Sequence, residues 1–174
     1  MIVNKISNVC LQTGRPQFYW KLKMTTDNTQ QDSPAGIELQ LLDWVQAKPL
    51  AEHIRRTVFI EEQHVPESEE WDDEDDEAIH VIAIHNGQAV ATARITLAGK
   101  IGRMAVLKAH RKHGIASMML LKLIKEAQQQ GHQEIKLWSQ TYAQGFYKKH
   151  GFKTQGDVFL DAGIPHIEMS LLIG

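Results

Sequence analysis

A basic turn that ends on a glycine, between an apolar run and a long amphipathic segment, constrains this chain more than any other feature. Residues 101–107 form a short β-like run, and residues 115–129 place apolar side chains at helical spacing. The turn between them is rich in Lys, Arg and His and closes on Gly114. A glycine at the mouth of a helix lets free backbone N–H groups approach an anion, and the positive end of the helix dipole adds to the attraction. These residues therefore predict a phosphate-binding turn.

The turn fits the pattern R/Q-x-x-G-x-G/A, whose six positions are Arg111, Lys112, His113, Gly114, Ile115 and Ala116. So short a pattern recurs by chance, and its weight comes from the strand before it, the helix after it and the basic side chains around it. No Gly-Lys-Ser/Thr follows, which excludes a P-loop, and the further glycines of a dinucleotide-binding turn are missing. Together with the aromatic-rich segment 143–152, the turn indicates a coenzyme that carries a pyrophosphate.

Hydrophobic periodicity and turn residues predict an α/β domain with a mixed sheet. The Asn86-Gly87 pair is the strongest hairpin signal in the chain. The expected order is β-α-β-β-β-α-β-α-β-β. Strands are expected at residues 37–42, 78–84, 88–97, 101–107, 134–138, 152–159 and 166–173, and helices at 49–60, from 115 to Gly131, and at 142–150.

Composition favours one domain in a reducing compartment. A chain of 174 residues with 43% hydrophobic content can bury one sizeable core, which we expect at residues 37–174. Residues 1–36 end in a polar, aperiodic stretch that predicts a poorly structured leader or linker, and Met24 is an alternative translation start. Cys10 is the single cysteine, so no internal disulfide can form. Neither a spanning apolar run nor a signal-peptide core is present, so we expect a cytoplasmic protein without a membrane partner.

Charge is strongly segregated along the chain. The formal balance is −8 over residues 1–99, +9 over residues 100–153 and −3 over the last 21 residues. Nine carboxylates crowd into the eleven residues 67–77. This acidic run could attract a cationic amine, or it could be a solvated loop without a ligand; the spacing does not fit an EF-hand. The basic half lacks a recognised nucleic-acid motif, so no nucleic-acid partner is expected.

Several ordered motifs resemble the GCN5-related N-acetyltransferases. The turn at residues 111–116 resembles their pyrophosphate motif, and residues 143–152 resemble their second coenzyme motif, A-x-x-F-Y-x-x-x-G-F. Residues 58–66, the acidic run and residues 162–166 resemble the bacterial ElaA/YjcF-like subgroup. The resemblance extends over residues 37–174. It implies a mostly antiparallel mixed central sheet flanked by helices, and transfer of an acetyl group from acetyl-CoA to a primary amine in a ternary complex.

The resemblance also implies a site. In the family, the strand that matches Met104, Ala105 and Val106 parts from the strand at residues 135–138, and pantetheine lies in the gap. The backbone amides from Arg111 to Ala116 would then hold the pyrophosphate. Tyr147 matches the tyrosine that acts as general acid toward the departing thiolate, a role that suits a phenol with an ordinary pKa of about 10. Its alternative role is packing of an amphipathic ring.

Transfer to an amine also requires a proton acceptor. An alkylamine of pKa about 10.4 is neutral in only about one molecule in 2,500 at pH 7, a deficit of roughly 4–5 kcal/mol. Glu61, Glu62 and His80 are candidate bases, and the sequence does not select among them. His110 and His113 lack a third ligand at a suitable spacing, so no metal site is expected.

The sequence leaves several points open. The acceptor could be a small-molecule or a peptide amine, and a homodimer is compatible with the sequence. A non-catalytic acyl-CoA-binding or sensing domain is the main alternative to a transferase, and Tyr147 favours the transferase because a binding domain does not need a placed acid.

Overall fold

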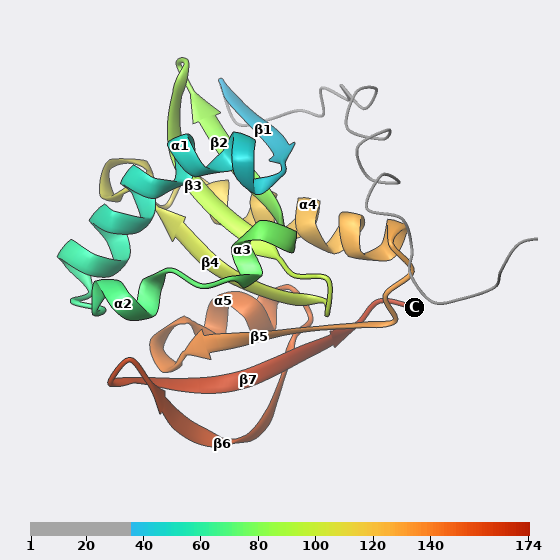
Figure 1. Cartoon of the computed structure of the whole chain (residues 1–174). Helices are drawn as coiled ribbons and strands as arrows, with labels where there is room; N and C mark the ends of the chain where they lie inside the picture. Colours follow the sequence, from blue (N-terminus) through green and yellow to red (C-terminus); the bar gives the residue numbers. More distant parts are fainter. Residues whose placement is uncertain (1–35) are drawn as a thin grey trace, which may run out of the picture. The chain divides into compact units, whose positions relative to one another are not determined.

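The computed structural model describes residues 36–174, so the predictions about the leader and about Met24 lie outside the described residues. A seven-stranded sheet in the order β1-β2-β3-β4-β5-β7-β6 forms the centre of this part of the chain (Figure 1). Every neighbouring pair is antiparallel except β4 and β5, which are parallel. The predicted mixed, mostly antiparallel sheet is confirmed.

The elements follow the predicted order, with three short helical segments added and two others overlapping the ends of predicted helices. Their bounds are β1 (Ile37–Leu42), α1 (Trp44–Arg55), the π-helix η1 (Arg56–Glu62), α2 (Glu67–Glu70), α3 (Glu74–Glu77), β2 (Ile79–His85), β3 (Gln88–Ile95), β4 (Lys100–Val106), the 3₁₀ turn η2 (Lys108–His110), α4 (Ile115–Gln129), β5 (Glu134–Gln140), the 3₁₀ turn η3 (Thr141–Ala143), α5 (Gln144–Lys149), β6 (Lys153–Asp161) and β7 (Ile164–Leu172).

The hairpins arise from local turn chemistry. Asn86 and Gly87, between β2 and β3, have φ angles of 50° and 77°. Positive φ at both central residues defines the two-residue turn whose twist matches that of the flanking strands, so the predicted hairpin is confirmed. Ala162 and Gly163, between β6 and β7, repeat this geometry with φ angles of 48° and 75°.

The first helix begins earlier than predicted. The Asp43 side chain accepts a hydrogen bond of 3.0 Å from the backbone N–H of Gln46, and this cap starts α1 at Trp44. Pro49 therefore lies inside the helix rather than near its start. The prediction of a start at residue 49 gave the proline more weight than the cap, and that start is wrong.

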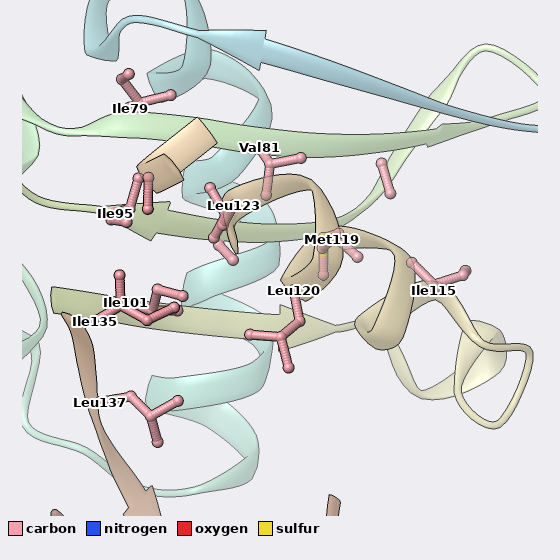
Figure 2. Packing of buried hydrophobic residues seen from close by; sticks show 14 of the residues in the cluster. Ile79, Val81, Ile95, Ile101, Ile115, Met119, Leu120, Leu123, Ile135 and Leu137 are labelled. Atoms are coloured by element: carbon pink, nitrogen blue, oxygen red, sulfur yellow. The ribbon is translucent and has the colours of Figure 1, made fainter. Parts of the chain in front are cut away.

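Helix α4 packs on one face of the sheet. Figure 2 shows Met119, Leu120 and Leu123 of α4 lying among apolar side chains of the strands. The helix ends at the Schellman motif that Gly131 allows, because the His132 N–H bonds Ala127 O at 3.1 Å while Gly131 has φ 83°. The predicted apolar face and the predicted end of this helix are confirmed.

Helix α1 covers the opposite face of the same strands (Figure 1). On β2, Val81 belongs to the cluster that contains α4, whereas Ile82 packs with Ala47 and Ala51 of α1. Successive side chains of a strand point to opposite faces, so both faces of this half of the sheet are buried. In the β5–β7–β6 half, apolar residues such as Leu137 and Met169 are buried on the α4 side.

Candidate functional site

The strands β4 and β5 part after two residue pairs. Lys100 pairs with Lys136 and Ile101 with Leu137, and the pairing recorded between these strands ends there. The register between β3 and β4 shifts between Thr92 and Arg94, which marks a β-bulge. Arg103, on the bulged strand, has φ 50°. The bulge turns the second half of β4 away from β5, and a gap opens in the middle of the sheet.

Met104, Ala105 and Val106, the three β4 residues expected to face a coenzyme, point in different directions. The Leu107 N–H bonds Val90 O at 3.0 Å, and backbone groups alternate along a strand, so the polar groups of Ala105 turn toward β3 and those of Val106 toward the gap. The Ala105 side chain is buried with Ile54 of α1. The Met104 side chain lies at the gap.

The turn at residues 111–116 has the geometry of an anion cradle. Lys112 and Gly114 have φ angles of 66° and 79°, and Gly114 caps α4 without a side-chain hydrogen bond. The amides of Ile115, Ala116 and Ser117 lie in the first turn of α4, where no preceding helical carbonyl is available to them. A Cβ built on Gly114 would meet nothing within 4 Å, so the front of the turn is open. These donors suit a phosphate group.

The side chain of Arg111 forms hydrogen bonds to other parts of the protein. Its guanidinium binds Glu62 in η1 through two hydrogen bonds of 2.5 and 2.8 Å, and its Nε donates to Val106 O at 2.9 Å. The hydrogen bond from Arg111 holds the pKa of Glu62 below its usual range. The Arg111 side chain therefore ties η1 to the β4 edge, and Glu62 is engaged rather than free to act as a base.

Tyr147 lies on α5 beside the gap. Its hydroxyl is 3.8 Å from Met104 Sδ, a weak hydrogen bond across from β4. Its ring makes edge-on contacts with Phe146 at 4.9 Å and with Phe152 at 5.9 Å between centroids. Burial raises the pKa of Tyr147 to about 12, with a smaller contribution from Tyr142. The phenol therefore stays protonated at neutral pH and can donate a proton into the gap.

A cavity of about 380 Å³ adjoins the gap and includes Tyr147 and Met104 in its lining. Its floor comes from β5, β7 and the β6–β7 hairpin, where Trp138, Gln140 and His166 line it. Its wall comes from the acidic segment and from η1. The cavity thus lies on the face of the sheet opposite α4, between the short helices and the exposed half of the sheet.

Two of the nine carboxylates of the acidic run are buried, so this part of the run belongs to the folded interior and not to a solvated loop. Glu70 and Asp75 are each 2% exposed. Arg55 of α1, itself 1% exposed, donates to Glu70 Oε1 at 2.5 Å and to both Asp75 oxygens at 2.9 and 2.8 Å. Arg94 of β3 donates to Asp75 Oδ1 at 2.5 Å. The sequence-based alternatives missed this buried ion network.

Asp72 extends the network to the bulge of β4. Arg94 donates to both its oxygens at 2.6 and 2.8 Å, and Arg103 donates to Asp72 Oδ2 at 2.8 Å. These arginines hold the pKa of Asp72 below its usual range, although burial acts in the opposite direction. The segment that contains α2 and α3 is thereby fixed against β3 and β4, so it forms a rigid wall of the cavity.

The predicted base candidates lie away from the cavity lining. His80 is 1% exposed, its Nε2 lies 3.0 Å from Asp75 O, and its ring stacks on Trp44 at 4.8 Å. Burial lowers the pKa of His80. Glu61 is exposed on η1, and neither residue lines the cavity. The geometry therefore favours none of Glu61, Glu62 and His80.

Several cavity residues escaped sequence reasoning. Trp138 was expected only as the end of a strand and Tyr142 only as the start of a helix, and Gln140 had no role assigned to it. His166 had a signal, because it closes the segment 162–166 that resembles the ElaA/YjcF subgroup. Sequence reasoning assigned this segment no role, since only the hairpin between β6 and β7 carries His166 to the cavity.

Residues 36–174 contain neither a candidate metal site nor a candidate membrane-spanning helix. Within that range, the structure brings no three His, Cys, Asp or Glu side chains together in an arrangement that could hold a metal ion. None of the helices described there combines the length and the apolar character that crossing a bilayer requires.

Comparison with protein families gives one extended match. The acetyltransferase (GNAT) domain family matches residues 32–173. The uncharacterized N-acetyltransferase YjcF of Bacillus subtilis is 38% identical over 121 residues, which cover 67% of this chain and 86% of that protein.

Solved structures agree with these sequence matches. The crystal structure of Escherichia coli ElaA has a TM-score of 0.69 and 28% identity, over 77% of this chain and 98% of that one. An acyl-CoA N-acyltransferase from Pseudomonas aeruginosa has a TM-score of 0.69 and 25% identity, over 78% of this chain and 99% of that one.

Proposed function

The chain belongs to the acetyltransferase (GNAT) domain family and is an acyltransferase, and from this premise we propose that it transfers an acetyl group from acetyl-CoA to a primary amine. The transfer is direct, within a ternary complex of the protein, the coenzyme and the amine. The observation that carries the proposal is the gap between β4 and β5, which joins an anion-binding turn to a cavity past the hydroxyl of Tyr147.

The residues around the gap fit an acyl-CoA. Uncapped amides at Ile115 and Ala116 and the left-handed backbone of Lys112 and Gly114 suit the pyrophosphate. Lys112 and His113 are exposed beside the turn, where a cation can add to the attraction of phosphate. The backbone of Val106 faces the gap, as an extended amide-containing arm requires. The Arg111 side chain contributes by holding this edge through Val106 O, and its backbone amide belongs to the proposed phosphate turn.

Tyr147 has the protonation state that the reaction needs. The transfer breaks the carbon–sulfur bond of the thioester, and the departing thiolate needs a proton. With its pKa raised to about 12, Tyr147 is protonated over the whole working range of pH. The same burial raises the basicity of a thiolate beside it, because both anions lose hydration. The phenol can therefore donate as negative charge develops on sulfur.

The cavity defines the space for the acceptor. A volume of about 380 Å³ admits a small-molecule amine or the side chain of a peptide. The aromatic and polar floor at Trp138 and Gln140 can contact the carbon chain and the polar groups of such a ligand. We assign the acetyltransferase domain to residues 37–174 and expect it to act in the cytoplasm.

A thiol-release assay tests the proposal. The full chain is mixed with acetyl-CoA and a panel of alkylamines, amino sugars and lysine peptides, and free coenzyme thiol is measured together with the acetylated product by mass spectrometry. Amine-dependent thiol release that matches the acetylated product supports the transferase. Tight acetyl-CoA binding by calorimetry, with no transfer to any amine, would instead identify a binding or sensing domain.

A further inference from the structure

The proposed function requires a proton acceptor, and His166 is the cavity residue with the right bonding. His166 lies on β7 opposite Gln140, the last residue of β5, and the chain continues from Gln140 through η3 to the helix of Tyr147. Its ring lines the same cavity as Tyr147, although the residue is only 7% exposed. From this placement we propose that His166 accepts the proton of the acceptor amine, an inference that rests on the proposed function.

The hydrogen bond at the other ring nitrogen fixes which atom can accept. His166 Nδ1 lies 2.8 Å from Ile164 O. A carbonyl only accepts, so Nδ1 carries a hydrogen and donates it in the neutral ring and in the cation alike. Nε2 is then the one nitrogen with a lone pair, and it is the atom at which a proton can arrive and leave. The bond to Ile164 O survives both states, so the ring need not move when it is protonated.

Neighbouring rings and the hairpin hold the imidazole in place. Phe159 of β6 pairs with His166 in the sheet register, and their rings stack with centroids 6.2 Å apart. Pro165 precedes His166 directly and fixes its own φ, so the backbone that carries the ring is stiff. A base held in one orientation needs little reorganisation at the moment of transfer.

The other candidate bases of the cavity are carboxylates. Glu70, Asp72 and Glu74 bind arginine side chains. Glu69 of the acidic run and Asp161 of the β6–β7 hairpin also line the cavity, and neither side chain forms an ion pair within residues 36–174. A carboxylate there can attract the ammonium and stabilise the imidazolium that forms. Asp161 is the natural competitor for the role of base, so the test includes it.

Two side chains of the protein, His166 and Tyr147, account for all the proton transfers of the reaction. The ammonium loses one proton to Nε2 of His166, and this proton later passes to solvent. The neutral nitrogen forms a carbon–nitrogen bond with the acetyl carbon as the carbon–sulfur bond breaks. Tyr147 gives its proton to the sulfur, and the second proton lost by the nitrogen returns to the phenolate through water. The net products are the amide, the free thiol and one proton.

The test uses a variant that keeps the structural bond and removes the base. In His166→Asn, the side-chain amide can still donate to the Ile164 carbonyl but has no basic nitrogen. We expect kcat with the best alkylamine of the panel to fall by about 10²–10⁴, the contribution usual for a general base. Acetyl-CoA affinity, measured by calorimetry, should stay within about threefold, because the ring faces the cavity and not the phosphate turn.

Amines that are already neutral at pH 7 distinguish a general base from a residue that only packs. Methoxyamine and aniline are unprotonated at pH 7. In His166→Asn, the fall in kcat for these amines should therefore be at least tenfold smaller than the fall for the alkylamine. An equal loss for all amines would assign His166 a packing role, and unchanged rates would remove it from the reaction. His166→Gln is the second variant if His166→Asn melts at a much lower temperature.

Asp161→Asn is the comparison within the same hairpin. A large loss with alkylamines in Asp161→Asn, with full activity in His166→Asn, would make the aspartate the base and overturn the inference. If the unmodified chain transfers acetyl to no amine, the proposed function fails, and the role of His166 fails with it. If the unmodified chain is active and His166→Asn is equally active, only the role of His166 fails.

Discussion

The buried ion network around Asp75 predicts an unequal response within a run of similar residues. Asp75 accepts three hydrogen bonds from the guanidinium groups of Arg55 and Arg94, and all three side chains are at most 3% exposed. Its neighbour Asp76 is exposed. Asp75→Asn removes the charge that these two arginines share, whereas Asp76→Asn removes an equal charge from the surface.

The expected cost follows from what remains in the interior. Arg55 keeps Glu70 and Arg94 keeps Asp72, but a guanidinium cannot lose its proton to relieve a missing partner. The new amide group also places N–H donors against guanidinium donors. Removing one partner of a buried ion pair typically lowers the free energy of unfolding by about 3–5 kcal/mol. With about 3–4 °C per kcal/mol for a domain of this size, Tm should fall by about 10–20 °C.

Urea unfolding followed by circular dichroism measures the difference. Asp75→Asn should lower the free energy of unfolding by about 3–5 kcal/mol, and Asp76→Asn should change it by less than about 0.5 kcal/mol. Equal and small effects of the two substitutions would mean that Asp75 is solvated, as a loop interpretation of the sequence allows. The wall of the cavity would then not be rigid.

Three further predictions concern catalysis, the coenzyme and pH. Tyr147→Phe should lower kcat by about 10²–10⁴ at nearly constant KM and Tm, because the ring contacts stay and only a weak bond to sulfur is lost. A parallel loss of kcat and Tm would indicate that Tyr147 serves only in packing. Gly114→Asp should abolish acetyl-CoA binding in calorimetry by placing a negative charge at the turn, while Gly131→Asp, at a φ of 83° beyond the opposite end of α4, should leave binding intact; equal effects would refute the cradle. Asp72 has a lowered pKa in the folded chain, so its stabilisation is complete above the ordinary aspartate range and is lost as pH falls through the folded value. The stability difference between the unmodified chain and Asp72→Asn should therefore be largest near pH 7 and shrink below about pH 4; a difference that grows in acid would contradict this sign.

Local patterns predicted the elements because their causes are local. The apolar spacing of residues 115–129 and the glycine at position 131 are sufficient to specify α4 and its end. The Asn86-Gly87 pair specifies its hairpin for the same reason. The start of α1 was missed because a single capping residue, Asp43, outweighs a proline that a helix can tolerate.

Only part of the candidate site could be predicted from the sequence. The turn at residues 111–116 and Tyr147 lie in motifs that can be recognised in sequence, and the structure places them beside one gap. The side chain of Arg111 binds Glu62, 49 residues earlier in the chain, and the sequence did not predict this contact. A long side chain chooses its partner by the folded geometry, which no local spacing reveals.

The sequence by itself determined the order of strands and helices, the glycine turn before α4 that we propose to bind the pyrophosphate, and the presence of a phenol in the second motif. These features depend on consecutive residues and on backbone preferences that act over one or two turns. Only the tertiary structure decided that Glu70 and Asp75 of the acidic run are buried, because the arginines that pair with the run come from three separate elements. It also decided that His166 faces the cavity, because that depends on the pairing of β5 with β7. Charge in a sequence is only a count of ionisable groups, and its effect is set by which groups the fold removes from water together.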